Sequence, residues 1–164
     1  MQIDKFRNHT ISIPSDGKYE IGVQSHKVKD VANFKPKFAF DYISDRGGTF
    51  CFNSSNLGLN HYKDLIFGLK EASKHTYKDL EKSHTFHFHD IDFEDVSIRK
   101  SDFYKALINQ YDGEDYIVPY QLKIKNKSRV IGFLYDATFY LVMYDCDHKA
   151  YGDKKQKSKR KKIK

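Results

Sequence analysis

The apolar pattern of the last third of the chain constrains the fold more than any other feature. From Tyr120 to Lys125, apolar and polar residues alternate strictly, which is the period of a strand with one buried face. The polar members, expected to face water, are Gln121, Lys123 and Lys125. Two further apolar runs follow, separated by two residues, a length typical of a hairpin. The sequence therefore predicts a three-stranded antiparallel meander over 120–125, 129–135 and 138–144.

Helices are predicted before this meander. After Asn60, a plausible N-cap, apolar residues recur at the three-four spacing of one helix face. These residues are Tyr62, Leu65, Ile66, Leu69 and Ala72. Thr76 and Asp79 have the spacing of a capping box, which predicts a second helix to about Lys82. A third helix is expected over 102–108, with Ser101 as its cap.

The first third of the chain has turn residues between short apolar runs, which predicts further strands at 18–23, 37–43 and 49–52. Gly47 and Gly48 have no phosphate-loop motif around them and are interpreted as a hairpin turn. We therefore expect an α+β fold in which a helical pair packs on one face of an antiparallel sheet. Residues 1–152 are predicted to form a single domain.

The positive charge of the chain is concentrated at its C-terminus. Eight of the 29 basic residues and one of the 22 acidic residues lie in 153–164, which leaves 21 of each sign elsewhere. The basic residues of this segment are Lys154, Lys155, Lys157, Lys159, Arg160, Lys161, Lys162 and Lys164. We expect a disordered tail that binds polyanions without sequence preference, or that only aids solubility.

Other classes of protein are disfavoured by the sequence. No apolar run approaches the length of a membrane span, and Met1 to Ile13 lacks the apolar core of a signal peptide. Cys51 and Cys146 are the two cysteines, and their wide separation gives no metal-binding or disulfide pattern. A cytoplasmic protein with reduced thiols and no contact with a membrane is therefore expected.

A wider pattern spans the predicted helices and the meander. Arg129 precedes aliphatic residues, Asp136 lies at the hairpin, and the signature F-Y-x-V-x-x-D-x-x-H-x-x-Y runs from Phe139 to Tyr151. In these features residues 60–151 resemble the RelE/ParE superfamily of small toxins. The chain is also similar to a set of uncharacterised bacterial proteins that end in the same signature. The resemblance implies a RelE-like topology for 60–151 and leaves 1–59 as a strand-rich N-terminal extension.

The resemblance also implies a function. Members of the superfamily that cleave messenger RNA on the ribosome use basic residues with a His or Tyr and no metal or other cofactor. It would make Arg129 the phosphate clamp, His148 the general acid or base, and Tyr151 a second proton-transfer or stacking group. RNA or the ribosome, and an antitoxin or other protein, would be the partners. A purely structural interpretation stays open, in which Arg129 pairs with an acidic neighbour on the sheet.

A histidine-rich segment precedes the third predicted helix. In a strand, His87 and His89 would point to one side and the two intervening phenylalanines to the other. With His84 and nearby aspartates they could hold a metal, although one segment rarely supplies a whole site. A role in phosphate binding is the alternative that we retain. The predicted nucleic-acid-binding residues are therefore His87, His89, Lys149 and the basic residues of the tail.

Two functions from different classes fit these observations. The first is a RelE/ParE-like toxin or a protein of phage or mobile-element conflict, acting on RNA as a metal-independent endoribonuclease. The second is a non-catalytic module that binds a protein through its folded domain and nucleic acid through its basic tail. The position of Arg129, His148 and Tyr151 relative to His87 and His89 should favour one of them.

Overall fold

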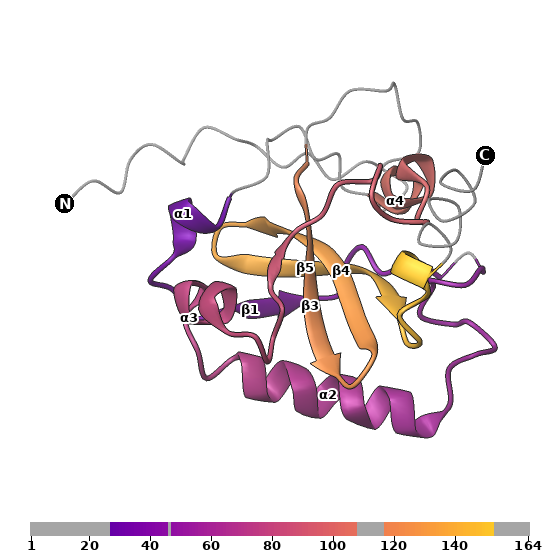
Figure 1. Ribbon diagram of the computed structural model, residues 1–164, viewed down its shortest axis with the longest axis horizontal. Coiled ribbons are helices and arrows are strands. Elements are labelled where there is room, and N and C mark those ends of the chain that lie inside the picture. The colour runs from indigo at the N-terminus through magenta and orange to yellow at the C-terminus, as the bar shows by residue number, and fades with distance from the viewer. Residues whose placement is uncertain (1–26, 46, 108–116, 153–164) are drawn as a thin grey trace, which may run out of the picture.

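The computed structural model describes residues 27–45, 47–107 and 117–152. The strands are β1 (Lys37–Ala39), β2 (His89–Asp90), β3 (Pro119–Lys125), β4 (Ser128–Tyr135) and β5 (Thr138–Asp145). The helices are α1 (Val28–Val31), α2 (Leu59–Ala72), α3 (Tyr77–Lys82) and α4 (Lys100–Leu107), and 149–152 form a final helical turn. The strands form one five-stranded sheet in the order β1-β5-β4-β3-β2 (Figure 1). The α+β class predicted from the sequence is confirmed.

The three-stranded meander forms the centre of this sheet. Strands β3, β4 and β5 pair antiparallel, with bounds within one residue of the predicted ones. Asp136 and Ala137 join β4 to β5 with φ angles of 46° and 57°. Positive φ at both positions is the geometry of a type I′ turn, whose twist matches that of the strands it connects.

The N-terminal strands differ from the prediction. Within the expected 37–43 strand, only β1 forms, and it pairs parallel to β5 rather than antiparallel. The expected strand at 49–52 is a series of turns, held to β5 by a single bond from the Tyr144 N–H to the Phe50 carbonyl (2.9 Å). Gly47 and Gly48 have positive φ but no flanking strands, so they are not a hairpin turn. The expected strand at 18–23 lies outside the described residues.

The three predicted helices form, but some details differ. Ser101 lies within α4, which begins at Lys100, so it is not the cap, and Tyr62 and Ile66 of the predicted apolar face are exposed (38% and 57%). In α3, the Thr76 hydroxyl accepts from the Asp79 N–H (3.2 Å) and the Thr76 N–H donates to the Asp79 carboxylate (3.1 Å), which confirms the capping box. Helix α2 begins at Leu59, so Asn60 is not its N-cap. The cap residue is Gly58, because its N–H donates to the imidazole Nδ1 of His61 (2.9 Å).

Both faces of the sheet are covered. Helices α2 and α3 pack on the first face, and the strand residues of that core are Tyr120, Leu122, Val130, Leu134, Phe139, Leu141 and Tyr144. Helix α4 packs on the second face, where the strand residues are Ile131, Phe133, Val142 and Met143. Figure 1 shows α2 below the sheet and α4 above it in that view. No helix among the described residues is long and apolar enough to cross a bilayer.

A bulge in β5 sets which residues face α4. The pairing with β4 passes from Met143 opposite Ile131 to Leu141 opposite Gly132, so Val142 has no partner across the ladder. Val142 and Met143 therefore both belong to the second core. After the bulge, successive side chains of β5 again point to opposite faces of the sheet. Tyr144 therefore joins the first core and Asp145 points to the second face.

Candidate functional site

Two buried charged residues meet on the second face of the sheet. Arg129 of β4 lies directly opposite Asp145 of β5, and their exposed fractions are 9% and 2%. The Asp145 carboxylate accepts from the backbone N–H groups of Lys149 and Ala150, both at 2.9 Å. Asp145 therefore uses its two oxygens to hold the final helical turn rather than to bind the guanidinium.

The guanidinium of Arg129 makes few hydrogen bonds, and those it makes are long. Its Nη1 donates to the carbonyls of Asn126 and Ser128, both at a long 3.4 Å. Its Nε–H is buried and has no hydrogen-bond partner within the described part of the chain. Burial lowers the pKa of Arg129, while the nearby Asp145 and Tyr151 raise it. Because an arginine stays charged in proteins, this is a buried cation with an unused donor.

A chain of side-chain hydrogen bonds runs next to Arg129. The Tyr151 hydroxyl donates to Gln121 Oε1 (2.8 Å), which leaves the Gln121 amide as donor to His89 Nε2 (2.8 Å). His89 Nδ1 then carries the ring proton and donates to the Asp90 carbonyl (2.6 Å). Each donor in this assignment has one acceptor, so the chain orients Gln121 and the ring of His89 together.

Tyr151 links this chain to Arg129 and to His148. The rings of His148 and Tyr151 stack, with centroids 5.0 Å apart and planes 20° from parallel. Burial raises the pKa of Tyr151, while the positive charge of Arg129 opposes that shift. The Tyr151 hydroxyl therefore stays protonated near neutral pH, and its place in the hydrogen-bond chain suits it to positioning rather than to proton transfer.

His87 lies at the surface of the same region. Partial desolvation lowers its pKa most, followed by the positive charges of Lys123, Arg129 and His89, with a smaller effect of His84. Its ring makes no hydrogen bond within the described residues. Its carbonyl accepts from the Gln121 amide at 3.4 Å. An exposed, neutral imidazole in a cationic environment can both approach an anion and accept a proton.

The backbone around two of these histidines is strained. His87 and His148 have φ angles of 42° and 61°, in the left-handed region that residues other than glycine rarely adopt. The other non-glycine residues with positive φ in the described chain are Asn126, Asp136 and Ala137, all between strands of the meander. The left-handed conformation of His87 ends the turn at 84–86, because its N–H donates to the Ser83 carbonyl (3.2 Å). His148 has no such turn before it, and surrounding contacts can hold an unfavourable conformation of this kind at a functional site.

The structure brings five of the six predicted site residues that it describes into one region. Gln121 bonds to His89, to Tyr151 and to the His87 carbonyl. His148 joins through its stacking on Tyr151, and Arg129 lies close enough to Tyr151 and His87 to shift their pKa. Lys149 contributes its backbone N–H to Asp145, and its ammonium pairs with Asp147 at 3.3 Å. The basic residues of the tail lie outside the described chain.

Sequence reasoning missed three members of this region: Gln121, Lys123 and Asp145. Gln121 was expected to face water, but it is only 4% exposed because the second face of the sheet is also covered. The register places Lys123 opposite Arg129, and Arg129 opposite Asp145. The sequence signal for Gln121 and Lys123 was that they share one side of their strand, whereas alternation alone places Asp145 on the side of Phe139 and Leu141, and the bulge reverses it.

The chain matches no protein-family model, no curated protein and no solved structure. The function must therefore be argued from the site itself.

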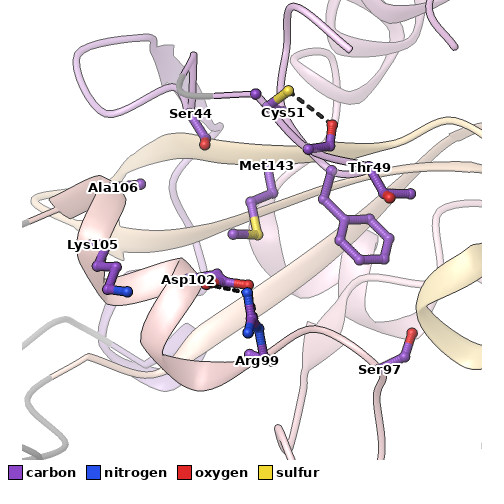
Figure 2. Close-up of a pocket in the computed structure, with 12 residues that line it drawn as sticks. Ser44, Thr49, Cys51, Ser97, Arg99, Asp102, Lys105, Ala106 and Met143 are labelled. Carbon is purple, nitrogen blue, oxygen red and sulfur yellow. Dashed lines mark hydrogen bonds and ion pairs between the residues drawn. The ribbon is translucent and has the colours of Figure 1, made fainter. Parts of the chain in front are cut away.

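A separate cavity of about 530 Å³ lies between α4 and the segment 44–51. Figure 2 shows Lys105 and Asp102 on the α4 side, and Ser44 and Cys51 across from them. Arg99 borders it, but its guanidinium is bound by Asp102 through two contacts of 2.8 and 3.1 Å. This pairing neutralises the cation, so the cavity is a weaker candidate for an anion than the region around Arg129.

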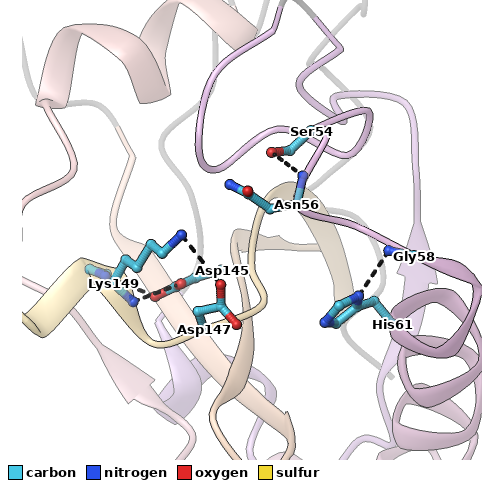
Figure 3. A network of polar contacts seen from close by, with 8 residues as sticks. Ser54, Asn56, Gly58, His61, Asp145, Asp147 and Lys149 are labelled. Carbon is cyan, nitrogen blue, oxygen red and sulfur yellow. Dashed lines mark hydrogen bonds and ion pairs between the residues drawn. The ribbon is translucent and has the colours of Figure 1, made fainter.

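The metal site considered for His84, His87 and His89 is not formed by the described residues. His89 instead binds Gln121 and the Asp90 carbonyl. In the described chain, one group of three His, Cys or acidic side chains brings its ligand atoms within 4.8 Å of one another: His61, Cys146 and Asp147. Figure 3 shows His61 and Asp147 in the surrounding polar contacts.

Proposed function

We propose that this protein binds the phosphate backbone of RNA in the region of Arg129 and cleaves it without a metal, as a RelE/ParE-like toxin. The observation that carries the proposal is the buried Nε–H of Arg129, which has no hydrogen-bond partner among residues 27–45, 47–107 and 117–152. The positive charges of Lys123 and Arg129 also act on the nearby imidazole of His87. A buried cation with an unused donor is costly unless it serves an anion. Phosphate is an anion whose geometry matches the fork of donors on a guanidinium.

The residues support a consistent division of roles. Lys123 contacts the phosphate at the surface, and Arg129 provides a fixed positive charge beneath it. His87, neutral at physiological pH, takes the proton from the ribose 2′-hydroxyl, whose oxygen attacks phosphorus. The 5′-oxygen of the next nucleotide leaves with a proton from His148, giving a 2′,3′-cyclic phosphate and a 5′-hydroxyl. Tyr151 and Gln121 position His148 and His89 around the reacting phosphate.

Cleavage of a short single-stranded RNA by the purified protein tests this proposal. We expect His87→Ala and His148→Ala to lose at least tenfold in rate, as is typical when a general acid or base is removed. Lys123→Gln should weaken RNA binding, whereas Lys63→Gln on the exposed side of α2 makes the same charge change away from the site and should not. Unchanged cleavage by all of these variants would refute the catalytic assignment.

A second candidate function has its own observation. Three apolar side chains of α2 are largely exposed: Leu59 (70%), Ile66 (57%) and Phe67 (65%). Exposed apolar residues grouped on one helix mark a surface for a protein partner. In this function the folded domain binds the apolar surface of another protein, and the tail binds nucleic acid.

Deletion of residues 153–164 separates the two functions. If the folded domain has its own phosphate site, the truncated protein keeps an RNA affinity that Lys123→Gln reduces further. If nucleic acid is bound by the tail alone, deletion abolishes the affinity and its salt dependence together. Induced expression of the wild type, Arg129→Ala and His148→Ala adds a cellular test, and equal growth of the three cultures would contradict a toxin.

A further inference from the structure

Three potential metal ligands meet where the first turn of α2 lies beside the segment after β5. The ligand atoms of His61, Cys146 and Asp147 all lie within 4.8 Å of one another. His61 belongs to α2, whereas Cys146 and Asp147 directly follow β5, so two elements distant in sequence contribute. Figure 3 shows the His61 imidazole and the Asp147 carboxylate approaching from these two segments. We propose that this group binds Zn²⁺.

The donor set selects the metal. A thiolate sulfur, an imidazole nitrogen and a carboxylate oxygen are the ligands that Zn²⁺ takes in proteins, whereas Ca²⁺ and Mg²⁺ prefer oxygen ligands alone. Zn²⁺ is four-coordinate in most such sites, so three protein ligands leave one position for water. The three ligands also come from two elements, as metal sites usually require, whereas His84, His87 and His89 come from a single segment.

The surrounding contacts hold the ligands close before a metal binds. The hydroxyl of Tyr144, a fully buried residue, donates to the carbonyl of His61 (2.9 Å), which ties the end of β5 to the start of α2. The ring of Tyr144 also stacks on Phe52, with centroids 5.7 Å apart. Asp145, which directly precedes Cys146, is fixed by its two bonds to the final helical turn. The two residues before Cys146 are therefore both held in place.

Two exposed contacts must change when the metal binds. His61 Nδ1 accepts from the Gly58 N–H (2.9 Å), so the other nitrogen, Nε2, is the one available to the metal. Coordination through Nε2 moves the ring proton to Nδ1 and releases Gly58, whose N–H is exposed and can bind water. Asp147 also gives up its ion pair with Lys149, in which both side chains are about half exposed (49% and 48%). Each loss is small because solvent replaces the partner.

The thiol supplies the proton that the reaction releases. Cys146 is a free cysteine, and Zn²⁺ binds the thiolate form of a cysteine, so the thiol must lose its proton on binding. Zn²⁺ forms the Zn–S bond as the S–H bond breaks, and one proton passes to solvent for each ion bound.

Metal binding to the full-length protein tests the proposal, with Zn²⁺ measured against a chromophoric chelator and Co²⁺ as a spectroscopic substitute. We expect one tight Zn²⁺ per chain and a thiolate-to-cobalt charge-transfer band. Cys146→Ser should lose the band. Cys51→Ser should keep it, because the Cys51 thiol is also buried but donates to the Gly48 carbonyl and the Asn53 side chain, both at 2.9 Å.

A second variant keeps the test valid if Cys146→Ser does not fold. Asp147 is exposed, so Asp147→Asn should fold normally and weaken Zn²⁺ binding at least tenfold. Weak Zn²⁺ binding to histidines elsewhere would give no sulfur band and would not respond to either variant. The absence of a cobalt band in the wild type, or equal affinity in the wild type and Asp147→Asn, would overturn the proposal. Neither outcome bears on RNA binding, which is measured separately.

Discussion

Arg129 and Asp145 lie opposite each other on β4 and β5, yet the carboxylate binds two backbone N–H groups and leaves the guanidinium to two long contacts. The pair therefore differs from an ordinary buried ion pair. Asp145 has a structural role, because it holds the turn that carries His148 and Tyr151. Arg129 has an unused donor, which is the property expected of a binding residue. The two residues should respond differently to substitution.

Asp145→Asn should lower the free energy of unfolding by about 1–3 kcal/mol. The amide offers one oxygen where the carboxylate offers two, so one of the N–H groups of Lys149 and Ala150 loses its acceptor. Chemical denaturation measures the change. Asp95→Asn is the matched control, because Asp95 is exposed and its replacement should change stability by less than about 0.5 kcal/mol. Equal stability of the two variants would show that Asp145 does not hold the turn.

Arg129→Met should leave stability within about 1 kcal/mol of the wild type or raise it, while RNA binding falls. An apolar side chain of similar volume avoids the cost of burying a cation that is poorly paired. Denaturation and RNA titration on the same preparation separate the two effects. A loss of about 3–5 kcal/mol would instead show that Arg129 is a fully paired structural residue.

The pKa of His87 should lie below its ordinary value of about 6.5 and rise when positive charge is removed. Lys123→Gln should raise it, and bound phosphate should raise it further, whereas Lys63→Gln should not. NMR titration of the imidazole measures each shift. Because the pKa is lower in the folded protein, the unfolded chain takes up the proton first. The contribution of His87 to stability should fall as pH drops below about 6.5 and level off below its folded pKa.

Gly68→Ala should destabilise the protein by about 1–3 kcal/mol, although helix propensity alone favours alanine by about 1 kcal/mol. A Cβ at this position of α2 would lie 2.5 Å from Cγ2 of Ile124 and 3.1 Å from its carbonyl oxygen. Thermal unfolding measures the difference. Gly152→Ala has open space around it and should be close to neutral. A stabilised Gly68→Ala variant would mean that α2 can move away from β3.

Thr76→Ala should cost about 1 kcal/mol at pH 7, because Thr76 caps α3 through its bonds with Asp79. Hydrogen bonds from the Thr76 side chain and backbone lower the pKa of Asp79. The stability that the carboxylate adds is therefore present above its unfolded value of 3.8 and is lost as pH falls through the folded pKa. Chemical denaturation at pH 7 and at a pH below 3.8 should show that Thr76→Ala destabilises the protein less in acid. Thr85→Ala, at an exposed position, is the control.

The sequence by itself determined the local elements. Strict alternation after Pro119, the two-residue connection at Asp136 and Ala137, and the capping box at Thr76 each depend on residues close in the chain. Their geometry follows from backbone and side-chain preferences that act within a few residues. For the same reason, the α+β class and the meander were predictable, whereas Arg129 was named only through the resemblance to a toxin superfamily.

The tertiary structure alone decided which distant residues meet. The parallel pairing of β1 with β5 and the covering of the second face bury Gln121, a residue that alternation alone assigns to water. The bulge at Val142 directs Asp145 to the side of Arg129. Packing of α2 beside the end of β5 brings His61 to Cys146. No local preference encodes such contacts, because they arise from burial of the whole sheet between two layers of helices.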